Sequence, residues 1–295
     1  MIEDQASKLR FLAKKQENLA NYRKTVRTIA ISSGKGGVGK TNFTVNFGIA
    51  LSQLGQRVVI FDGDLGLANI DVICGLTPKD TLQDVITDTK TIAEILVDGP
   101  GGIKILPGAS GQMVANLDSA RLQLLIEKMQ YLEDLADILL IDTGAGISKH
   151  VIQLLEGADE VVVVVTPEPT SVTDAYSLVK ILLHQVKDAK ISILINQAGN
   201  KEEAYATFSR FEAVVQRFLH HQVRYFGMVL KDQFVTKSVM RQTPFVVSFP
   251  QAPASHCIKT LAEDVIGVLH KSAAPGKGIR QLLQGLMSRF TNNTV

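Results

Sequence analysis

Short apolar runs alternate with longer amphipathic stretches along this chain of 295 residues. Helical patterns separate most of the apolar runs. The first expected helix ends at Gly55, because glycine is common at the C-terminal end of a helix. Near-continuous apolar strands that alternate with helices predict an α/β fold with a mostly parallel, twisted β-sheet flanked by helices on both faces. Right-handed crossovers then place the loops after the strands at one edge, where ligands bind. The strands are expected at residues 26–33, 57–64, 103–108, 136–143, 159–167, 189–197 and 223–230, and helices at 41–55, 118–129 and 171–186.

Three segments of different character divide the chain. Residues 1–25 are rich in charge and predict a helix that precedes the first strand. Residues 26–271 form the main domain, which closes with a proline-rich crossing at 243–255 and a packed helix at 256–271. Residues 272–295 begin with a flexible linker, "SAAPGKG", and continue into a separate tail.

Composition narrows the classes of protein. The chain is 45% hydrophobic and 20% charged, as is usual for a soluble globular protein, and its net charge of +2 is too small to indicate nucleic acid by itself. The only two cysteines, Cys74 and Cys257, are far apart, which argues against a disulfide framework and against a zinc or iron–sulfur site. The start lacks the apolar core of a signal peptide, and no apolar run is long enough for a transmembrane helix.

A phosphate-binding loop lies between the first strand and the first helix. Its pattern is G-x-x-x-x-G-K-[ST], and the glycines allow backbone N–H groups to close around phosphate oxygens at a helix N-terminus. Lys40 is expected to hold the β and γ phosphates, and Thr41 to offer its hydroxyl to Mg²⁺. The loop comprises Gly34, Lys35, Gly36, Gly37, Val38, Gly39, Lys40 and Thr41.

Acidic and amide side chains follow three of the other expected strands. Asp62 and Asp64 end "VVIFDGD", and Asp142 ends "ILLID". Carboxylates at this edge can bind Mg²⁺ or orient the attacking water, so we assign the metal to Asp62 and Asp142 and the water to Asp64. A helix-capping aspartate is the alternative for each. Asn196 follows "ISILI" and either reads the nucleotide base with its amide or is an ordinary turn asparagine.

Lys35 is a second lysine in a loop that needs only one. The string "KGGVGKT" resembles the deviant Walker A motif of the MinD/ParA/nitrogenase iron protein group, and the resemblance spans roughly residues 26–270. It implies a MinD-like P-loop NTPase in which Lys35 crosses a homodimer interface to the phosphates of the partner's nucleotide. Glu168 and Asp174 match acids near that interface. The iron proteins need a bridging cysteine pair that Cys74 and Cys257 do not match.

The tail segment "GIRQLLQGLMSRF" carries one apolar stripe at helical spacing. Lysine and arginine flank the stripe and no acid is present, as in a helix that lies in a membrane interface. The alternative is a helix packed on the body. A tail that attaches to the membrane in this way is a feature of MinD-type proteins, so in this respect the chain resembles them more than it resembles ParA-type DNA partition ATPases. The stripe consists of Ile279, Leu282, Leu283, Leu286, Met287 and Phe290.

The N-terminal stretch "DQASKLR" resembles the DQAxxLR motif of the FlhG branch of this family. The matching residues are Asp4, Gln5, Leu9 and Arg10. The resemblance implies that this helix docks on the GTPase FlhF and stimulates its hydrolysis. Gln5 is the residue we assign to that stimulation, because an uncharged amide can orient water near a phosphate. A solvated helical arm is the alternative.

Together these features predict a cytoplasmic ATPase, attached reversibly to the inner face of the cell membrane, that uses ATP and Mg²⁺ and dimerises with ATP. The resemblance implies control of flagellar number and placement, with FlhF, flagellar switch-ring proteins and anionic lipids as partners. One alternative is a MinD-like division-site regulator. Another is a ParA-like DNA-partition or gene-regulatory ATPase. A DNA-binding role would leave the amphipathic tail unexplained, so nucleic acid is not an expected partner. Its basic surface would include Arg210, Arg217, His220, His221 and Arg224.

Overall fold

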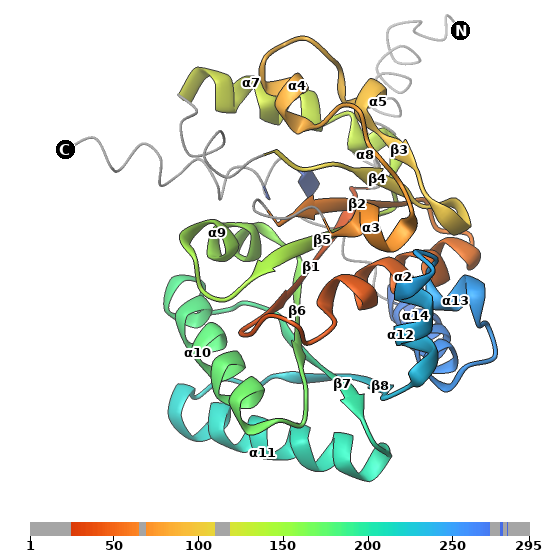
Figure 1. Cartoon of the computed structure of the whole chain (residues 1–295). Coiled ribbons are helices and arrows are strands. Elements are labelled where there is room, and N and C mark those ends of the chain that lie inside the picture. Colours follow the sequence, from red (N-terminus) through yellow and green to blue (C-terminus); the bar gives the residue numbers. More distant parts are fainter. Residues whose placement is uncertain (1–24, 65–68, 110–118, 272–277, 280–281, 283–295) are drawn as a thin grey trace, which may run out of the picture.

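A computed structural model describes residues 25–64, 69–109, 119–271, 278–279 and 282. In this part of the chain an eight-stranded sheet forms the centre, with the strand order β3-β4-β2-β5-β1-β6-β7-β8 (Figure 1). All neighbouring strands are parallel except the antiparallel pair β3 and β4 at one edge. The strands are β1 (Arg27–Ser33), β2 (Val58–Gly63), β3 (Val97–Asp98), β4 (Lys104–Leu106), β5 (Ile138–Ala145), β6 (Glu160–Val165), β7 (Ile191–Ala198) and β8 (Arg224–Leu230).

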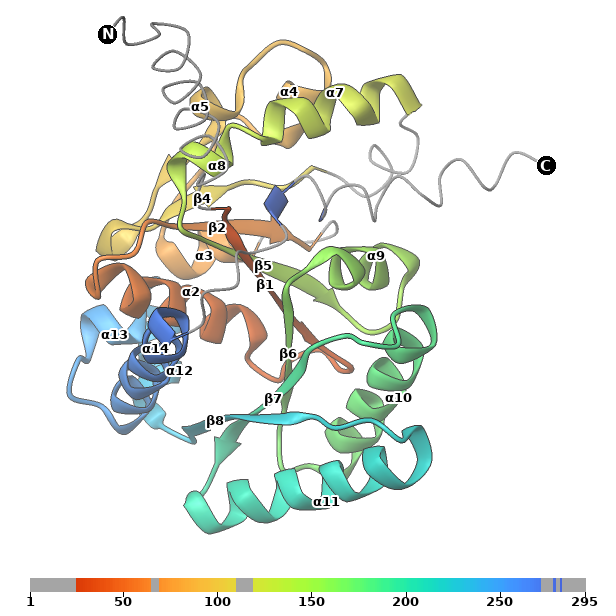
Figure 2. The same cartoon turned by 180° about the vertical axis from the view of Figure 1, so that it is seen from behind.

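Helices cover both faces of this sheet, as Figures 1 and 2 show from opposite sides. One face carries α4 (Leu82–Ile86), α5 (Ile92–Ile95), α7 (Ser119–Met129), α8 (Leu132–Leu135), α9 (Lys149–Gly157), α10 (Pro169–Gln185) and α11 (Lys201–Leu219). The other face carries α2 (Lys40–Gln53), α3 (Ile70–Cys74), the 3₁₀ turn η1 (Pro100–Gly102), α13 (Phe245–Ser248) and α14 (Pro253–Lys271), and α12 (Gln233–Met240) follows β8. The predicted fold class is therefore confirmed.

The two apolar cores follow from the alternation of side chains along the strands. Ile29 and Ile31 of β1 point into the core beneath α2, whereas Ala30 points into the core beneath α9 and α10. Helix α2 is buried along most of its length, and the rings of Phe43 and Phe47 stack with their centroids 5.1 Å apart. The helix therefore lies in the interior of the protein, and it carries the phosphate loop at its N-terminus.

Several boundaries differ from the expectation. The edge strand β3 was not predicted, because two residues are too few to show an apolar run. The crossing at 243–255 contains the short helix α13, and the helix expected at 256–271 begins at Pro253. Gly55 was predicted correctly: it follows α2 with a φ of 84°. Within the described residues, no helix combines the length and the apolar character that a bilayer crossing needs.

Candidate functional site

The phosphate loop joins β1 to α2 in the middle of the sheet. A Cβ atom added to Gly34 would collide with the backbone of Asp174 in α10, so the loop passes too close to that helix for a larger residue. Around Gly36 and Gly37, by contrast, an added Cβ would meet nothing within 4 Å. Backbone N–H groups and a helix N-terminus beside open space form a ready site for an anion.

Lys40 and Asp142 form a buried ion pair behind this loop. Nζ of Lys40 donates to Oδ1 of Asp142 at 2.9 Å, and the two side chains are 8% and 0% exposed. The hydroxyl of Thr44 lies between the carbonyl of Lys40, at 3.0 Å, and Oδ1 of Asp142, at 3.1 Å. The other oxygen of Asp142, Oδ2, is buried and has no hydrogen-bond partner among the residues that the structure describes. An unsatisfied buried carboxylate oxygen is costly, and a cation or a metal-bound water would satisfy it.

Asp62 lies beside Asp142, because the two residues are register partners on the adjacent parallel strands β2 and β5. Oδ1 of Asp62 accepts from the backbone N–H of Asp64 at 3.2 Å. Burial, and then the carboxylate of Asp142, raise the pKa of Asp62 to about 7. A divalent cation next to both carboxylates would remove this cost.

The geometry therefore fits a nucleotide polyphosphate with Mg²⁺. The sequence predicted Lys40, Asp62 and Asp142 together, and the structure places them together. Thr41 is the second residue of α2, directly after Lys40. Thr44 was missed: it lies one turn after Lys40 in a helix that reads as apolar, and its contact with Asp142 spans 98 positions.

Lys35 lies away from this buried group. Its Nζ donates to Oε2 of Glu168 and to Oγ1 of Thr170, both at 3.1 Å, and its side chain is 40% exposed. Glu168 precedes α10, and Thr170 belongs to its first turn. The two lysines of the loop thus have different surroundings: Lys40 is buried on a carboxylate in the core, and Lys35 is held at the surface.

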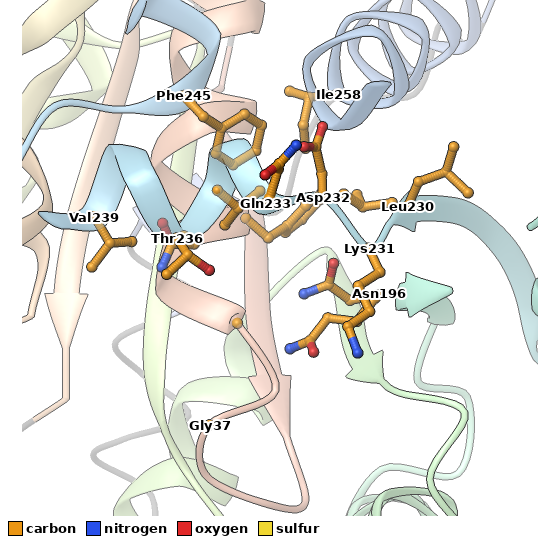
Figure 3. Close-up of a pocket in the computed structure, with 16 residues that line it drawn as sticks. Gly37, Asn196, Leu230, Lys231, Asp232, Gln233, Thr236, Val239, Phe245 and Ile258 are labelled. Carbon is orange, nitrogen blue, oxygen red and sulfur yellow. The ribbon is translucent and has the colours of Figure 1, made fainter. Parts of the chain in front are cut away.

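A cavity of about 450 Å³ opens beside the phosphate loop (Figure 3). Val229, Val235 and Phe245 contribute apolar walls, and Asn196 and Lys231 approach from the ends of β7 and β8. An apolar slot with a few polar groups next to a phosphate site suits a nucleoside. Besides Gly37 and Gly39 of the phosphate loop, Asn196 is the residue of this cavity that the sequence predicted as nucleotide-binding. The apolar strand at 223–230 ends at the same edge, so the residues that follow it were the available signal.

The tail meets the body at its first turn. Ile279 and Leu282 are both 0% exposed and belong to the core beneath α8 and α9. A Cβ added to Gly157 of α9 would collide with the backbone of Leu282. Of the predicted membrane stripe, these two residues are therefore buried in the protein. The other four, Leu283, Leu286, Met287 and Phe290, lie outside the described residues.

Glu133 of α8 holds the chain at both ends of the main domain. Its Oε2 accepts from the backbone N–H of Val26 at 2.8 Å, and its Oε1 accepts from the backbone N–H of Ile279 at 2.6 Å. One carboxylate thus contacts the entry to β1 and the start of the tail. The predicted GTPase-activating residues, Asp4, Gln5, Leu9 and Arg10, precede this point and lie outside the described residues.

The basic residues named for a DNA-binding alternative lie on α11, in the segment that follows it and at the start of β8. The guanidinium of Arg224 pairs with the buried Glu160, although the side chain of Arg224 is 52% exposed. The guanidinium of Arg217 lies 5.4 Å from the ring centroid of Phe218. The ion pair offsets the charge of Arg224, whereas the ring contact leaves the charge of Arg217 unchanged.

The chain matches known proteins along most of its length. A family profile described as "ParA: NUBPL iron-transfer P-loop NTPase" matches residues 24–266. The antiactivator FleN of Pseudomonas aeruginosa is 42% identical over 241 residues, which are 81% of this chain and 86% of FleN. The flagellum site-determining protein YlxH of Helicobacter pylori is 28% identical over 97% of this chain and 99% of YlxH.

A solved structure of a related protein has a similar fold. The septum site-determining protein MinD of Pyrococcus horikoshii, complexed with Mg-ADP, superposes with a TM-score of 0.67 at 26% identity over 84% of this chain and all of that one. The phosphate loop and its carboxylates are the features that such a ligand requires. The chain therefore belongs to the ParA/MinD family of P-loop NTPases, which hydrolyse nucleotide and use ATP with Mg²⁺.

Proposed function

We propose that this chain is an ATP-switched regulator of flagellar number and placement that dimerises when it holds ATP. Its similarity to FleN and YlxH supports the flagellar role. The observation that carries the switch is the position of Lys35, whose ammonium is held at the surface by Glu168 and Thr170. A surface lysine beside a phosphate loop is available to a second copy of the chain.

Within one chain, the phosphate loop and the carboxylates behind it would bind the nucleotide and its metal. Lys40 would leave Asp142 for the β and γ phosphate oxygens, and Thr41, Asp62 and Asp142 would hold Mg²⁺. When bound, the metal would supply positive charge that neutralises the charge developing on the phosphates. Asp64, which follows Asp62 at the end of β2, orients the attacking water. The backbone N–H groups of the loop position the phosphates for this attack.

Between two chains, Lys35 completes the site. Each Lys35 exchanges its exposed ion pair with Glu168 for the phosphates held by the facing chain. An exposed ion pair contributes at most about 1 kcal/mol, so this exchange costs little. A positive charge supplied by the partner stabilises the transition state only in the dimer. Hydrolysis then limits the lifetime of the dimer.

The test is the Lys35→Ala variant, measured by sedimentation with ATP and with ADP. We expect the native chain to dimerise with ATP, and the variant to lose dimerisation or hydrolysis. Lys201→Ala, an exposed lysine at the start of α11, is the matched control. Normal dimerisation and normal turnover in Lys35→Ala would refute the switch.

The membrane part of the proposal concerns residues 272–295. The chain would be cytoplasmic and attach reversibly to anionic lipid through the apolar stripe of the tail. Because Ile279 and Leu282 are buried on the body, the tail must leave the body before these two residues reach lipid. Replacing Leu283 and Phe290 by Glu should release the protein from anionic liposomes. Retained ATP-dependent sedimentation with liposomes would exclude the tail as the anchor.

The partner part of the proposal concerns residues 1–25. The motif with Asp4, Gln5, Leu9 and Arg10 would dock on an FlhF-type GTPase, and switch-ring proteins of the flagellum would bind elsewhere on the chain. A peptide of residues 1–25 should stimulate GTP hydrolysis by such a GTPase, and the Gln5→Ala peptide should not. Absence of stimulation by the native peptide would remove this activity without affecting the ATP switch.

A further inference from the structure

The end of β7 has an irregular backbone at the cavity. Gln197 has a φ of 58°, in the left-handed region that residues other than glycine seldom adopt. The pairing of β7 with β8 shifts register between Ile195 and Ala198, on either side of Asn196 and Gln197. Conformations of this kind cost about 1–3 kcal/mol and gather at functional sites, where a bulge can redirect a side chain.

The irregularity brings two adjacent amides to the same place. In a regular strand, Asn196 and Gln197 would point to opposite faces of the sheet. Here both line the cavity beside the phosphate loop. Measured from the point where a Cβ on Gly39 would lie, Nδ2 of Asn196 is at 2.5 Å and Nε2 of Gln197 is at 3.9 Å. The two side chains therefore face a ligand in this cavity together.

The orientation of the Asn196 amide follows from its partner. It contacts the carbonyl oxygen of Val38 at 2.7 Å, and a carbonyl can only accept, so the contacting atom is the amide nitrogen. Asn196 is 8% exposed and held in place, which leaves Oδ1 as an acceptor. The side chain of Gln197 is exposed and has no hydrogen-bond partner among the residues that the structure describes, so its amide is available to a ligand.

We propose that Gln197 contacts the base of the nucleotide and, together with Asn196, makes the site selective for adenine. Oδ1 of Asn196 accepts from the exocyclic amino group, and Nε2 of Gln197 donates to the adjacent ring nitrogen. Guanine presents a carbonyl oxygen and a ring N–H at the same edge. An acceptor would then face Oδ1 of Asn196, which cannot turn away because the contact with Val38 holds the amide, whereas Gln197 would have to turn its amide so that Oε1 accepts from the ring N–H. Unpaired polar groups of this kind exclude the wrong ligand strongly.

The test is the ratio of the dissociation constants for Mg-ATP and Mg-GTP. The native chain prefers ATP. Gln197→Ala and Gln197→Gly should each weaken ATP binding about tenfold, which is about 1.4 kcal/mol, and leave GTP binding nearly unchanged. The glycine variant matters because glycine adopts the backbone conformation of Gln197 without strain, so folding is not at risk. The loss should appear in KM for ATP more than in kcat.

Two further variants separate the amide from its surroundings. Gln197→Glu keeps the size but replaces the donor with an acceptor, so it should shift the ratio toward GTP further than Gln197→Ala does. Gln242 is a second exposed glutamine with a left-handed φ, 50°, and it does not line the cavity. Gln242→Ala should leave the ratio unchanged.

Retention of the native ATP preference in both Gln197→Ala and Gln197→Gly would overturn the inference. A loss of ATP and GTP binding by the same factor in both variants would overturn it too, because it would assign Gln197 to the phosphates or the ribose. The inference depends on the nucleotide site and is independent of the flagellar role. Failure of the dimerisation test with Lys35→Ala would leave it standing.

Discussion

The two ends of the nucleotide site are built in different ways. The phosphate end comes from eight consecutive residues, Gly34 to Thr41, and from carboxylates at the ends of β2 and β5. The base end is assembled from the ends of β7 and β8, from the loop after β8 and from α12, α13 and α14. Its polar contacts come from side chains such as those of Asn196 and Gln197, whereas the loop offers mainly backbone groups.

This difference separates affinity from selectivity. Backbone N–H groups and Lys40 recognise phosphates, which every nucleoside triphosphate shares. The two amides recognise a base, which differs between nucleotides. The ends meet at the contact between Asn196 and the carbonyl of Val38, within the phosphate loop. Changes at the base end should therefore alter the ratio of ATP to GTP binding, and changes at the phosphate end should not.

The largest effect is expected where the two ends meet. Gly39 has a φ of 86°, and a methyl group there would lie 2.5 Å from Nδ2 of Asn196. Gly39→Ala should therefore weaken ATP binding at least about 100-fold, or about 2.7 kcal/mol, as measured by titration. Gly267→Ala is the control, because an added Cβ there meets nothing within 4 Å. An affinity within threefold of the native value would contradict this reading of Gly39.

The second prediction concerns the free energy of unfolding and its dependence on pH, which reports on the buried carboxylate Asp62 at the phosphate end. The pKa of Asp62 is raised from 3.8 to about 7, so in the absence of nucleotide and metal the folded state holds this proton more tightly than the unfolded chain. The stability contributed by Asp62 is full below pH 3.8 and is lost as the pH rises through about 7. The slope is at most about 1.4 kcal/mol per pH unit.

Asp62→Asn removes this titration. Relative to the native chain, the variant should gain about 2 kcal/mol in free energy of unfolding between pH 5 and pH 8, measured with urea in a chelator. Asp98→Asn, an exposed acid, should show no such gain. Parallel pH profiles of native chain and Asp62→Asn would mean that the carboxylate is not destabilised by burial.

Asn196→Ala tests the base end. It removes the acceptor for the amino group and the donor to Val38, so ATP binding should weaken about tenfold, or about 1.4 kcal/mol, with a larger loss for ATP than for GTP. Asn196→Asp keeps the acceptor but loses the donor, and it should weaken both nucleotides through the phosphate loop. Equal losses of ATP and GTP binding in Asn196→Ala would contradict the proposal that the base end determines selectivity.

The smallest effect is expected for Thr44→Val. The hydroxyl of Thr44 contacts the carbonyl of Lys40 and Oδ1 of Asp142, so its removal should cost about 1 kcal/mol of stability. ATP and GTP binding should fall together, by less than about threefold, or about 0.7 kcal/mol. A change in the ratio of ATP to GTP binding would show that the phosphate end also contributes to selectivity.

The same contrast explains what the sequence could predict. The phosphate loop is local, and the seven predicted apolar runs are strands, so Lys40, Asp62 and Asp142 were placed correctly at one edge of the sheet. The base end depends on a register shift at Gln197, which leaves no periodic pattern, and on the short helices α12 and α13, which were not predicted. A left-handed glutamine is invisible in the sequence, because glycine or asparagine is the usual signal for that conformation.

The tail shows a different limit of prediction. The spacing from Ile279 to Phe290 indicates an amphipathic helix, but an apolar stripe does not say whether lipid or protein covers it. The burial of Ile279 and Leu282 depends on Gly157 and Glu133, more than 100 positions away in the chain. Long-range packing of this kind decides the partner of a helix and cannot be deduced from its own sequence.

The most direct test of the dimer switch mixes two variants, Lys35→Ala and Asp64→Ala, each expected to be inactive alone. In a mixed dimer, the Lys35→Ala chain keeps Asp64 for its own nucleotide and receives Lys35 from its partner, so one complete site forms. We therefore predict that ATP hydrolysis reappears on mixing and follows the fraction of mixed dimers. A mixture no more active than the average of its two components would contradict the account, because Lys35 would then act within its own chain.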